Sequence, residues 1–131
     1  MESKKFIRIL RDADISVELH RHHFVGNEKD RVWIPQVAER GWTIITADKN
    51  IMLRPYEKLA VVEAKARLLI VSMGKRGSDE KMATTIANTY PRIVERFNAQ
   101  NAPLVLGLNL PSDEDILRGK SGRLTIRYPE Q

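Results

Sequence analysis

The spacing of hydrophobic residues changes along the chain from a helical period to a strand period and back. Residues 4–13 repeat apolar side chains at the spacing of one helix face, which predicts a helix. Residues 15–19 then alternate apolar and polar side chains, which predicts a half-buried strand. The polar stretch 20–29 contains Gly26 and Asn27 and is typical of a loop.

A second helix and strand follow. Residues 32–40 have a helical pattern, and Gly41 stands where a glycine would end that helix in a left-handed conformation. Pro35 lacks an N–H group and is unfavourable in that helix unless it lies in the first turn, where no hydrogen bond is lost. Residues 42–46 are rich in tryptophan, threonine and isoleucine and predict a strand.

The second half of the chain continues this alternation. Ser78, followed by two acidic residues, has the pattern of a helix start, and Pro91 predicts a bend or a restart within that helix. The remaining elements are a helix over 56–66, an aliphatic strand over 68–71, the helix from 79 towards 98, and strands over 104–110 and 123–128 separated by a loop. Such alternation predicts a three-layer α/β fold, with a mostly parallel central sheet flanked by helices. We expect one domain over 1–131, with an α/β core over 1–100 and a β-rich tail over 101–131.

The amino-acid composition excludes several classes of protein and of binding site but does not identify the function. The 131 residues include no cysteine, which excludes disulfides and thiolate metal sites and suits a cytoplasmic location. The chain begins without the apolar region of a secretory signal, and no apolar run is long enough to cross a membrane, so no membrane association is expected. The net charge of +5 mildly favours polyanionic partners such as nucleic acid.

Two aspartates stand at the outer ends of the second helix–strand pair. A helix of about ten residues spans about 15 Å. The strand that returns covers about 16 Å, so Asp30 and Asp48 should reach the same edge of the sheet. Two carboxylates at the carboxyl edge of an α/β sheet predict a divalent-metal site. The structural alternatives are an N-cap role for Asp30 and a turn role for Asp48.

Further polar residues fall near the same predicted edge. Glu28 is a neighbouring alternative ligand, and basic residues in loops after strands could hold phosphate groups beside the metal: Lys49, Arg54, Lys75 and Arg76. His20 and His22 form a His-x-His pair that could bind zinc, contact phosphate or shuttle protons. The sequence offers no matching third zinc ligand, so a structural or solvent-exposed role for the histidines is favoured.

Three segments resemble the PIN-like domains that are grouped with VapC-type toxins: VELHRHHF, DRVWIPQVAERGWTIITADKNI and RPYE. The resemblance extends from about Ser3 to Phe97. It implies a ribonuclease whose acidic residues hold Mg²⁺ or Mn²⁺, with Asp30 and Asp48 as metal ligands and catalytic residues. Asp79 would be a further acid. It also implies a toxin–antitoxin system, with RNA as substrate, an antitoxin protein as partner, and a homodimer as an open option.

The chain departs from the family pattern at its beginning. The family's first acid lies on an opening strand, whereas this chain starts with the helix that should follow that strand. The expectation is therefore that the start codon lies further upstream or that a metal ligand has been lost. The alternative to a ribonuclease is a non-catalytic PIN-like module that binds RNA or a protein.

Overall fold

The computed structural model describes residues 3–20, 30–72, 74 and 77–129. Its helical elements are α1 (Lys4–Asp12), α2 (Asp30–Glu39), the short 3₁₀ helix η2 (Ile51–Leu53), α3 (Pro55–Glu63), α4 (Asp79–Ala99) and α5 (Asp113–Leu117). Its strands are β1 (Thr43–Thr46), β2 (Arg67–Ser72), β3 (Leu104–Asn109) and β4 (Arg123–Tyr128). None of the helices in the described part of the chain is long and apolar enough to span a membrane.

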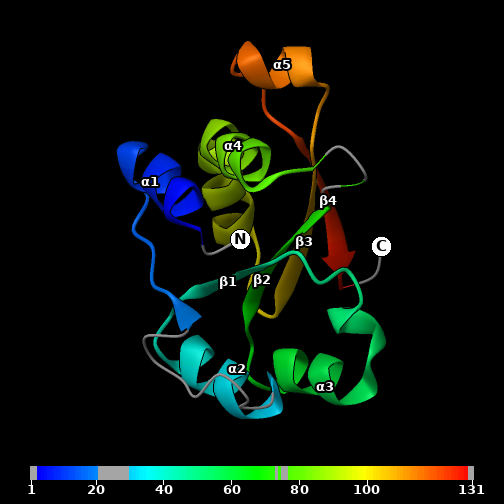
Figure 1. Cartoon of the computed structure of the whole chain (residues 1–131). Coiled ribbons are helices and arrows are strands. Elements are labelled where there is room, and N and C mark those ends of the chain that lie inside the picture. Colours follow the sequence, from blue (N-terminus) through cyan, green and yellow to red (C-terminus); the bar gives the residue numbers. More distant parts are fainter. Residues whose placement is uncertain (1–2, 21–29, 73, 75–76, 130–131) are drawn as a thin grey trace.

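The four strands form one sheet in the order β1-β2-β3-β4 (Figure 1). β1, β2 and β3 run parallel, and β4 returns antiparallel to β3. The predicted mostly parallel sheet is therefore confirmed. β2 and β3 are buried along nearly their whole length, which matches their continuous aliphatic sequences.

Two hydrophobic cores lie on opposite faces of this sheet and give the domain its three layers. Leu69 and Leu106 face the core that α1 and α4 cover. Leu68 and Val105 point the other way, into the core that α2 and α3 cover. Figure 1 shows the two pairs of helices on the two sides of the sheet. The segments after residue 100 thus complete the sheet and contribute to both cores.

The segment at residues 15–19 corrects the sequence prediction. Ile15 and Leu19 are buried while Ser16 and Glu18 are exposed, so the predicted alternation of inward and outward side chains is right. The segment nevertheless belongs to no strand and has no place in the sheet. Alternation reports which side of a segment faces a core, whereas a strand also needs a neighbour at hydrogen-bonding distance.

The structure shows how the helices end at or pass three residues, Gly41, Pro35 and Pro91. Gly41 has φ +76°, and Trp42 N–H donates to the Val37 carbonyl at 3.2 Å, so the predicted glycine stop of α2 is confirmed. The helix begins at Asp30, two residues before the predicted start, so Pro35 lies beyond the first turn. The longest helix, α4, runs continuously through Pro91 and does not restart there.

The expected loop between β3 and β4 contains the short helix α5, which the pattern analysis missed. Its start is capped because the Ser112 side chain accepts a hydrogen bond from Asp115 N–H at 3.2 Å. Three acidic residues lie in its first turn, where their negative charges stabilise the helix by interacting with the positive end of its dipole: Asp113, Glu114 and Asp115. A serine followed by acidic residues is the sequence pattern of a helix start, but this helix is too short to show a helical spacing of apolar residues.

Candidate functional site at the carboxyl edge of the sheet

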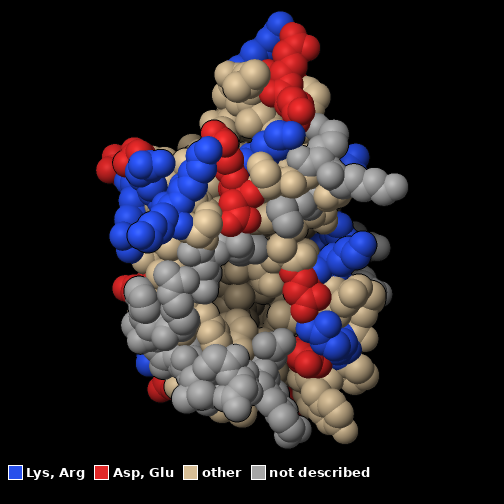
Figure 2. Space-filling view, viewed as in Figure 1, with Lys and Arg blue, Asp and Glu red and all other residues tan. Residues whose placement is uncertain are grey.

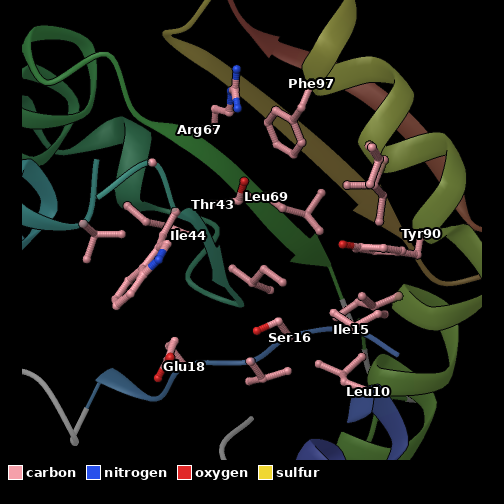
Figure 3. A pocket seen from close by; sticks show the side chains of 18 of the residues that line it. Leu10, Ile15, Ser16, Glu18, Thr43, Ile44, Arg67, Leu69, Tyr90 and Phe97 are labelled. Carbon is pink, nitrogen blue, oxygen red and sulfur yellow. The ribbon is translucent and has the colours of Figure 1, made fainter. Parts of the chain in front are cut away.

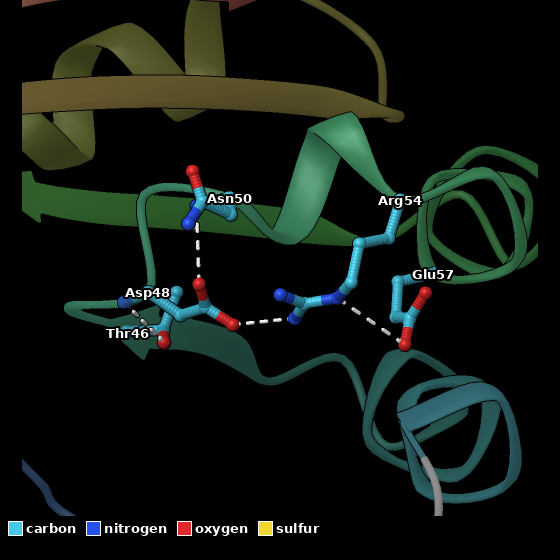
Figure 4. Close-up of polar contacts among 5 residues, drawn as sticks. All are labelled: Thr46, Asp48, Asn50, Arg54 and Glu57. Carbon is cyan, nitrogen blue, oxygen red and sulfur yellow. Dashed lines mark hydrogen bonds and ion pairs between the residues drawn. The ribbon is translucent and has the colours of Figure 1, made fainter.

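Asp48 lies two residues after the end of β1, in the turn that leads to η2 (Figure 4). Its backbone N–H donates to the Thr46 hydroxyl at 3.1 Å. Its carboxylate accepts a hydrogen bond from Asn50 N–H at 3.0 Å, which closes the turn from the side chain. These contacts fix the carboxylate at the edge of the sheet where the parallel strands end. The turn role that the sequence suggested for Asp48 is present.

The second oxygen of Asp48 forms an ion pair with Arg54. The Nη2 atom of Arg54 lies 2.5 Å from Oδ2 of Asp48, and its Nε lies 3.4 Å from Oε1 of Glu57. The Arg54 hydrogen bond holds the pKa of Asp48 below its ordinary value, and the Asn50 N–H adds to this effect. The side chains of Asp48 and Arg54 remain 39% and 42% exposed. Asp48 is therefore an ionised carboxylate that solvent can reach.

Asp30 is the first residue of α2. A tight turn joins the end of α2 to the start of β1, and the two elements pack together, so α2 begins on the side where β1 ends. The side chain of Asp30 and the whole of Glu28 lie outside the described residues. The meeting of the Asp30 and Asp48 carboxylates therefore stays a prediction.

Asp79 begins α4 beyond the carboxyl end of β2, the strand next to β1. A hydrogen bond with the Ser3 side chain lowers the pKa of Asp79. Ser3 also caps α1, and Lys5 in that helix lies 2.8 Å from Glu80. Asp79 thus joins the starts of two helices, which is a structural role besides the ligand role suggested from the sequence.

Two of the four predicted phosphate-binding residues, Lys49 and Arg54, lie in the described part of the structure. Arg54 is engaged by two carboxylates, as described above. Lys49 is exposed and makes no ion pair with a described residue. Lys75 and Arg76 lie outside the described residues. Figure 2 shows basic side chains gathered over α1, and acidic and basic side chains next to one another on the opposite side of the same face.

Of the two histidines predicted at this edge, the structure describes His20. The His20 ring contacts the Trp33 ring edge-on, with centroids 4.8 Å apart, in a half-buried position. This packing agrees with the structural role favoured from the sequence. His22 lies outside the described residues.

Oxygen ligands suit Mg²⁺ and Mn²⁺, and Mg²⁺ is often held by only one or two carboxylates together with water and substrate oxygens. Asp48 fits that chemistry because it is ionised and partly exposed. Among the residues that can be described, no three histidine, aspartate or glutamate side chains gather closely enough to hold a metal ion. Sequence analysis also missed Glu57, whose contact with Arg54 follows from its position three residues later at the start of α3.

The fold and the edge residues define an α/β domain with a carboxylate presented where parallel strands end. The PIN like domain family matches residues 3–73, more than half of the chain, and the chain belongs to this family. Family membership assigns it to a class of nuclease-like or RNA-binding modules. No curated protein and no solved structure matches the chain.

Proposed function

We propose that this protein is a metal-dependent ribonuclease of the VapC toxin-like type, which cleaves RNA phosphodiesters. The observation that carries the proposal is the ionised, half-exposed carboxylate of Asp48 at the carboxyl edge of a PIN-like sheet. Ligands and substrates of open α/β sheets bind at this edge. As further parts of the proposal, the protein acts in the cytoplasm and is controlled by an antitoxin protein.

In this proposal Asp48 and Asp30 hold the metal, and Asp79 or Glu28 is the additional acid. Bound Mg²⁺ or Mn²⁺ would polarise the scissile phosphate and lower the pKa of a bound water. Arg54 would also bind a phosphate group of the RNA, because a guanidinium can form bidentate hydrogen bonds with a phosphate as well as with a carboxylate. Lys49, exposed on the same turn, adds positive charge for the RNA backbone.

The test is the substitution Asp48→Asn in the full chain. We expect it to abolish cleavage of single-stranded RNA in buffer with Mg²⁺ or Mn²⁺. The melting temperature should change little, because the Asp48–Arg54 pair is exposed and screened by solvent. Asp12→Asn is the matched control, since Asp12 is an exposed aspartate at the end of α1. Equal cleavage by parent and Asp48→Asn would show that the site is wrongly assigned.

A non-catalytic module that binds RNA or a protein is the second candidate. The ion pair favours it, because Arg54 already neutralises the carboxylate that the ribonuclease would use for metal. Calorimetric titration with Mg²⁺ separates the two candidates. Metal binding that Asp48→Asn removes supports the ribonuclease, whereas RNA binding without metal binding at millimolar Mg²⁺ supports the module.

A further inference from the structure

The edge of the sheet formed by β4 carries positive charge that the proposed metal site does not use. At the other edge, beside β1, a cavity of about 500 Å³ has a mostly apolar lining and does not suit a polyanion (Figure 3). β4 has two exposed arginines, Arg123 and Arg127, and no acidic residue. Neither arginine makes an ion pair with a residue in the described part of the chain. The charge of β4 is therefore open to an anionic ligand.

A β-bulge sets the direction of the Arg127 side chain. Leu106 of β3 pairs with Ile126 of β4. The next pair is Val105 with Tyr128, so Arg127 lies between them as an extra residue without a partner on β3. A bulge of this kind interrupts the alternation of side chains between the two faces of a strand and can redirect a side chain. Bulges of this type are frequent beside functional sites.

Gly107 leaves room for the Arg127 guanidinium on the sheet. A Cβ atom at position 107 would lie 2.6 Å from Nε and 3.3 Å from Cζ of Arg127. Gly107 follows Val105 by two residues along β3, so both positions belong to the face of the sheet on the α2 and α3 side. Arg127 is nevertheless exposed to solvent. Its guanidinium is thus placed against the backbone of β3 in advance of any ligand.

A hydroxyl group lies beside the guanidinium. Thr125 pairs with Gly107, and its Oγ1 atom would lie 3.0 Å from the same Cβ position. This oxygen is buried and has no hydrogen-bond partner among the described residues. A buried hydroxyl without a partner is unfavourable, so it favours a ligand oxygen that accepts a hydrogen bond from it. Phosphate oxygens accept hydrogen bonds from guanidinium and from hydroxyl groups.

The guanidinium and the hydroxyl lie at the same level of the sheet as the Asp48 turn. The Thr46 hydroxyl accepts the hydrogen bond from Asp48 N–H. Thr46 of β1 pairs with Ile70 of β2, which pairs with Gly107 of β3. Gly107 in turn pairs with Thr125 of β4. Three strand spacings separate the ends of this row, or about 14 Å. A single strand of RNA covers that distance with a few nucleotides.

Basic side chains on α3 connect the two places. Lys58 lies one turn after Arg54, the partner of Asp48, so the two cations share one side of the helix. The Nζ atom of Lys58 lies 5.9 Å from the centre of the Tyr128 ring, and Tyr128 follows Arg127 directly in β4. A series of cations therefore leads from the Asp48 turn to β4.

We propose that Arg127 and the Thr125 hydroxyl form a phosphate subsite, which holds the RNA backbone a few nucleotides from the Asp48 turn. The guanidinium binds the phosphate through bidentate hydrogen bonds, and the hydroxyl donates to the same group. Contacts of this kind position the RNA chain and read no base. This proposal rests on the RNA substrate of the proposed function, though not on cleavage. β4 lies beyond residue 73, where the family match ends, so the family model does not describe this subsite.

The experiment measures binding of a fluorescein-labelled oligouridylate to the full chain by anisotropy, at several salt concentrations. The buffer contains no divalent metal, so that the RNA stays intact. Arg127→Gln should weaken binding by about three- to tenfold. It should also make the plot of log Kd against log salt concentration less steep by about 0.7, the value for one phosphate contact on a single strand. Arg92→Gln is the matched control, because Arg92 is exposed on α4, which covers the opposite face of the sheet.

Two further variants separate the position of the guanidinium from its charge. Gly107→Ala keeps every arginine but places a methyl group where the guanidinium lies, so it should weaken RNA binding as much as Arg127→Gln. Its melting temperature should stay close to that of the parent, because the nearest atom belongs to the flexible end of Arg127. Arg127→Lys keeps the charge but loses the bidentate geometry, so its affinity should lie between those of the parent and Arg127→Gln.

The outcomes separate this proposal from the ribonuclease proposal. Unchanged affinity and salt dependence in Arg127→Gln, with RNA binding by the parent, would overturn the subsite and leave the ribonuclease in place. Loss of binding in Arg127→Gln, in a parent that never cleaves RNA with Mg²⁺ or Mn²⁺, would support the subsite and refute the ribonuclease. A parent that binds no RNA would overturn both.

Two other results would also overturn the subsite. Equal losses in Arg127→Gln and Arg92→Gln would indicate attraction by net charge alone. Tighter binding of oligoglutamate than of oligouridylate, lost in Arg127→Gln, would assign the surface to an acidic protein segment.

Discussion

Replacing Gly122 with alanine should destabilise the protein because the added methyl group has no room. Gly122 immediately precedes β4, and its N–H donates to the buried Thr89 hydroxyl on α4 at 2.8 Å. A Cβ atom there would lie 2.5 Å from the Asn109 carbonyl oxygen and 2.9 Å from Cγ2 of Thr85. The nearest atom is backbone, so the start of β4 has to move away from β3 and α4.

The magnitude follows from two contributions. Forcing an extra carbon into a packed site costs about 1–3 kcal/mol. Moving Gly122 also weakens its buried hydrogen bond to Thr89, which adds about 1 kcal/mol. We therefore expect the free energy of unfolding to fall by about 2–4 kcal/mol. For a chain of this size, 3 kcal/mol lowers the melting temperature by about 10 °C.

The assay is chemical unfolding in urea, followed by circular dichroism, on the parent and two variants. Gly119→Ala is the control, because Gly119 has φ +75° but nothing lies within 4 Å of an added Cβ. Its cost is limited to the left-handed backbone, about 1 kcal/mol. The reasoning is refuted if Gly122→Ala costs less than Gly119→Ala, or if the two variants are equally stable.

Three further predictions concern buried hydroxyls and the edge carboxylate. Thr85→Val should leave stability unchanged or raise it, because the buried Thr85 hydroxyl has no hydrogen-bond partner in the described structure. Thr89→Val should lower the free energy of unfolding by about 1–3 kcal/mol, because the buried Thr89 hydroxyl donates to the Thr85 carbonyl and accepts from Gly122 N–H. Equal costs of the two variants in urea unfolding would contradict this. Because Arg54 lowers the pKa of Asp48, the stabilisation by their pair is present above the unfolded pKa of about 3.9 and is lost as pH falls through the folded value. Because the pair is exposed, Arg54→Gln should lower the melting temperature only slightly at pH 7 and should have no effect near pH 3. A pH-independent difference would exclude this explanation. Asp48→Asn should abolish RNA cleavage, as measured on a labelled single strand, and cleavage at the parent rate would disprove the ligand role.

The sequence predicts the fold well where elements are long and bury one face or both. The aliphatic runs of β2 and β3 and the glycine stop at Gly41 appear as expected. The errors occur where pairing decides the structure. Residues 15–19 have the side-chain pattern of a strand, but no strand among the described residues lies beside them to form a ladder. Pattern alone cannot reveal whether that neighbour exists.

The candidate site was only partly predictable, for a similar reason. A carboxylate after β1 follows from the position of Asp48 at the end of an apolar run. The ion pair with Arg54 depends on η2, a single 3₁₀ turn that brings residues six positions apart into contact. Such a short turn has no periodic pattern in the sequence. Arg54 was therefore expected to face phosphate, and its two carboxylate partners were not foreseen.

The central position of β3 has a practical consequence for dissecting the molecule. The family match ends at residue 73, yet Leu104, Leu106 and Leu108 on β3 are fully buried, and β3 covers one edge of β2. A fragment cut at the end of the match would expose the bare edge of β2 and the face of that strand that α4 covers. Such a fragment should aggregate rather than fold. The unit of homology in this protein is therefore shorter than its unit of folding.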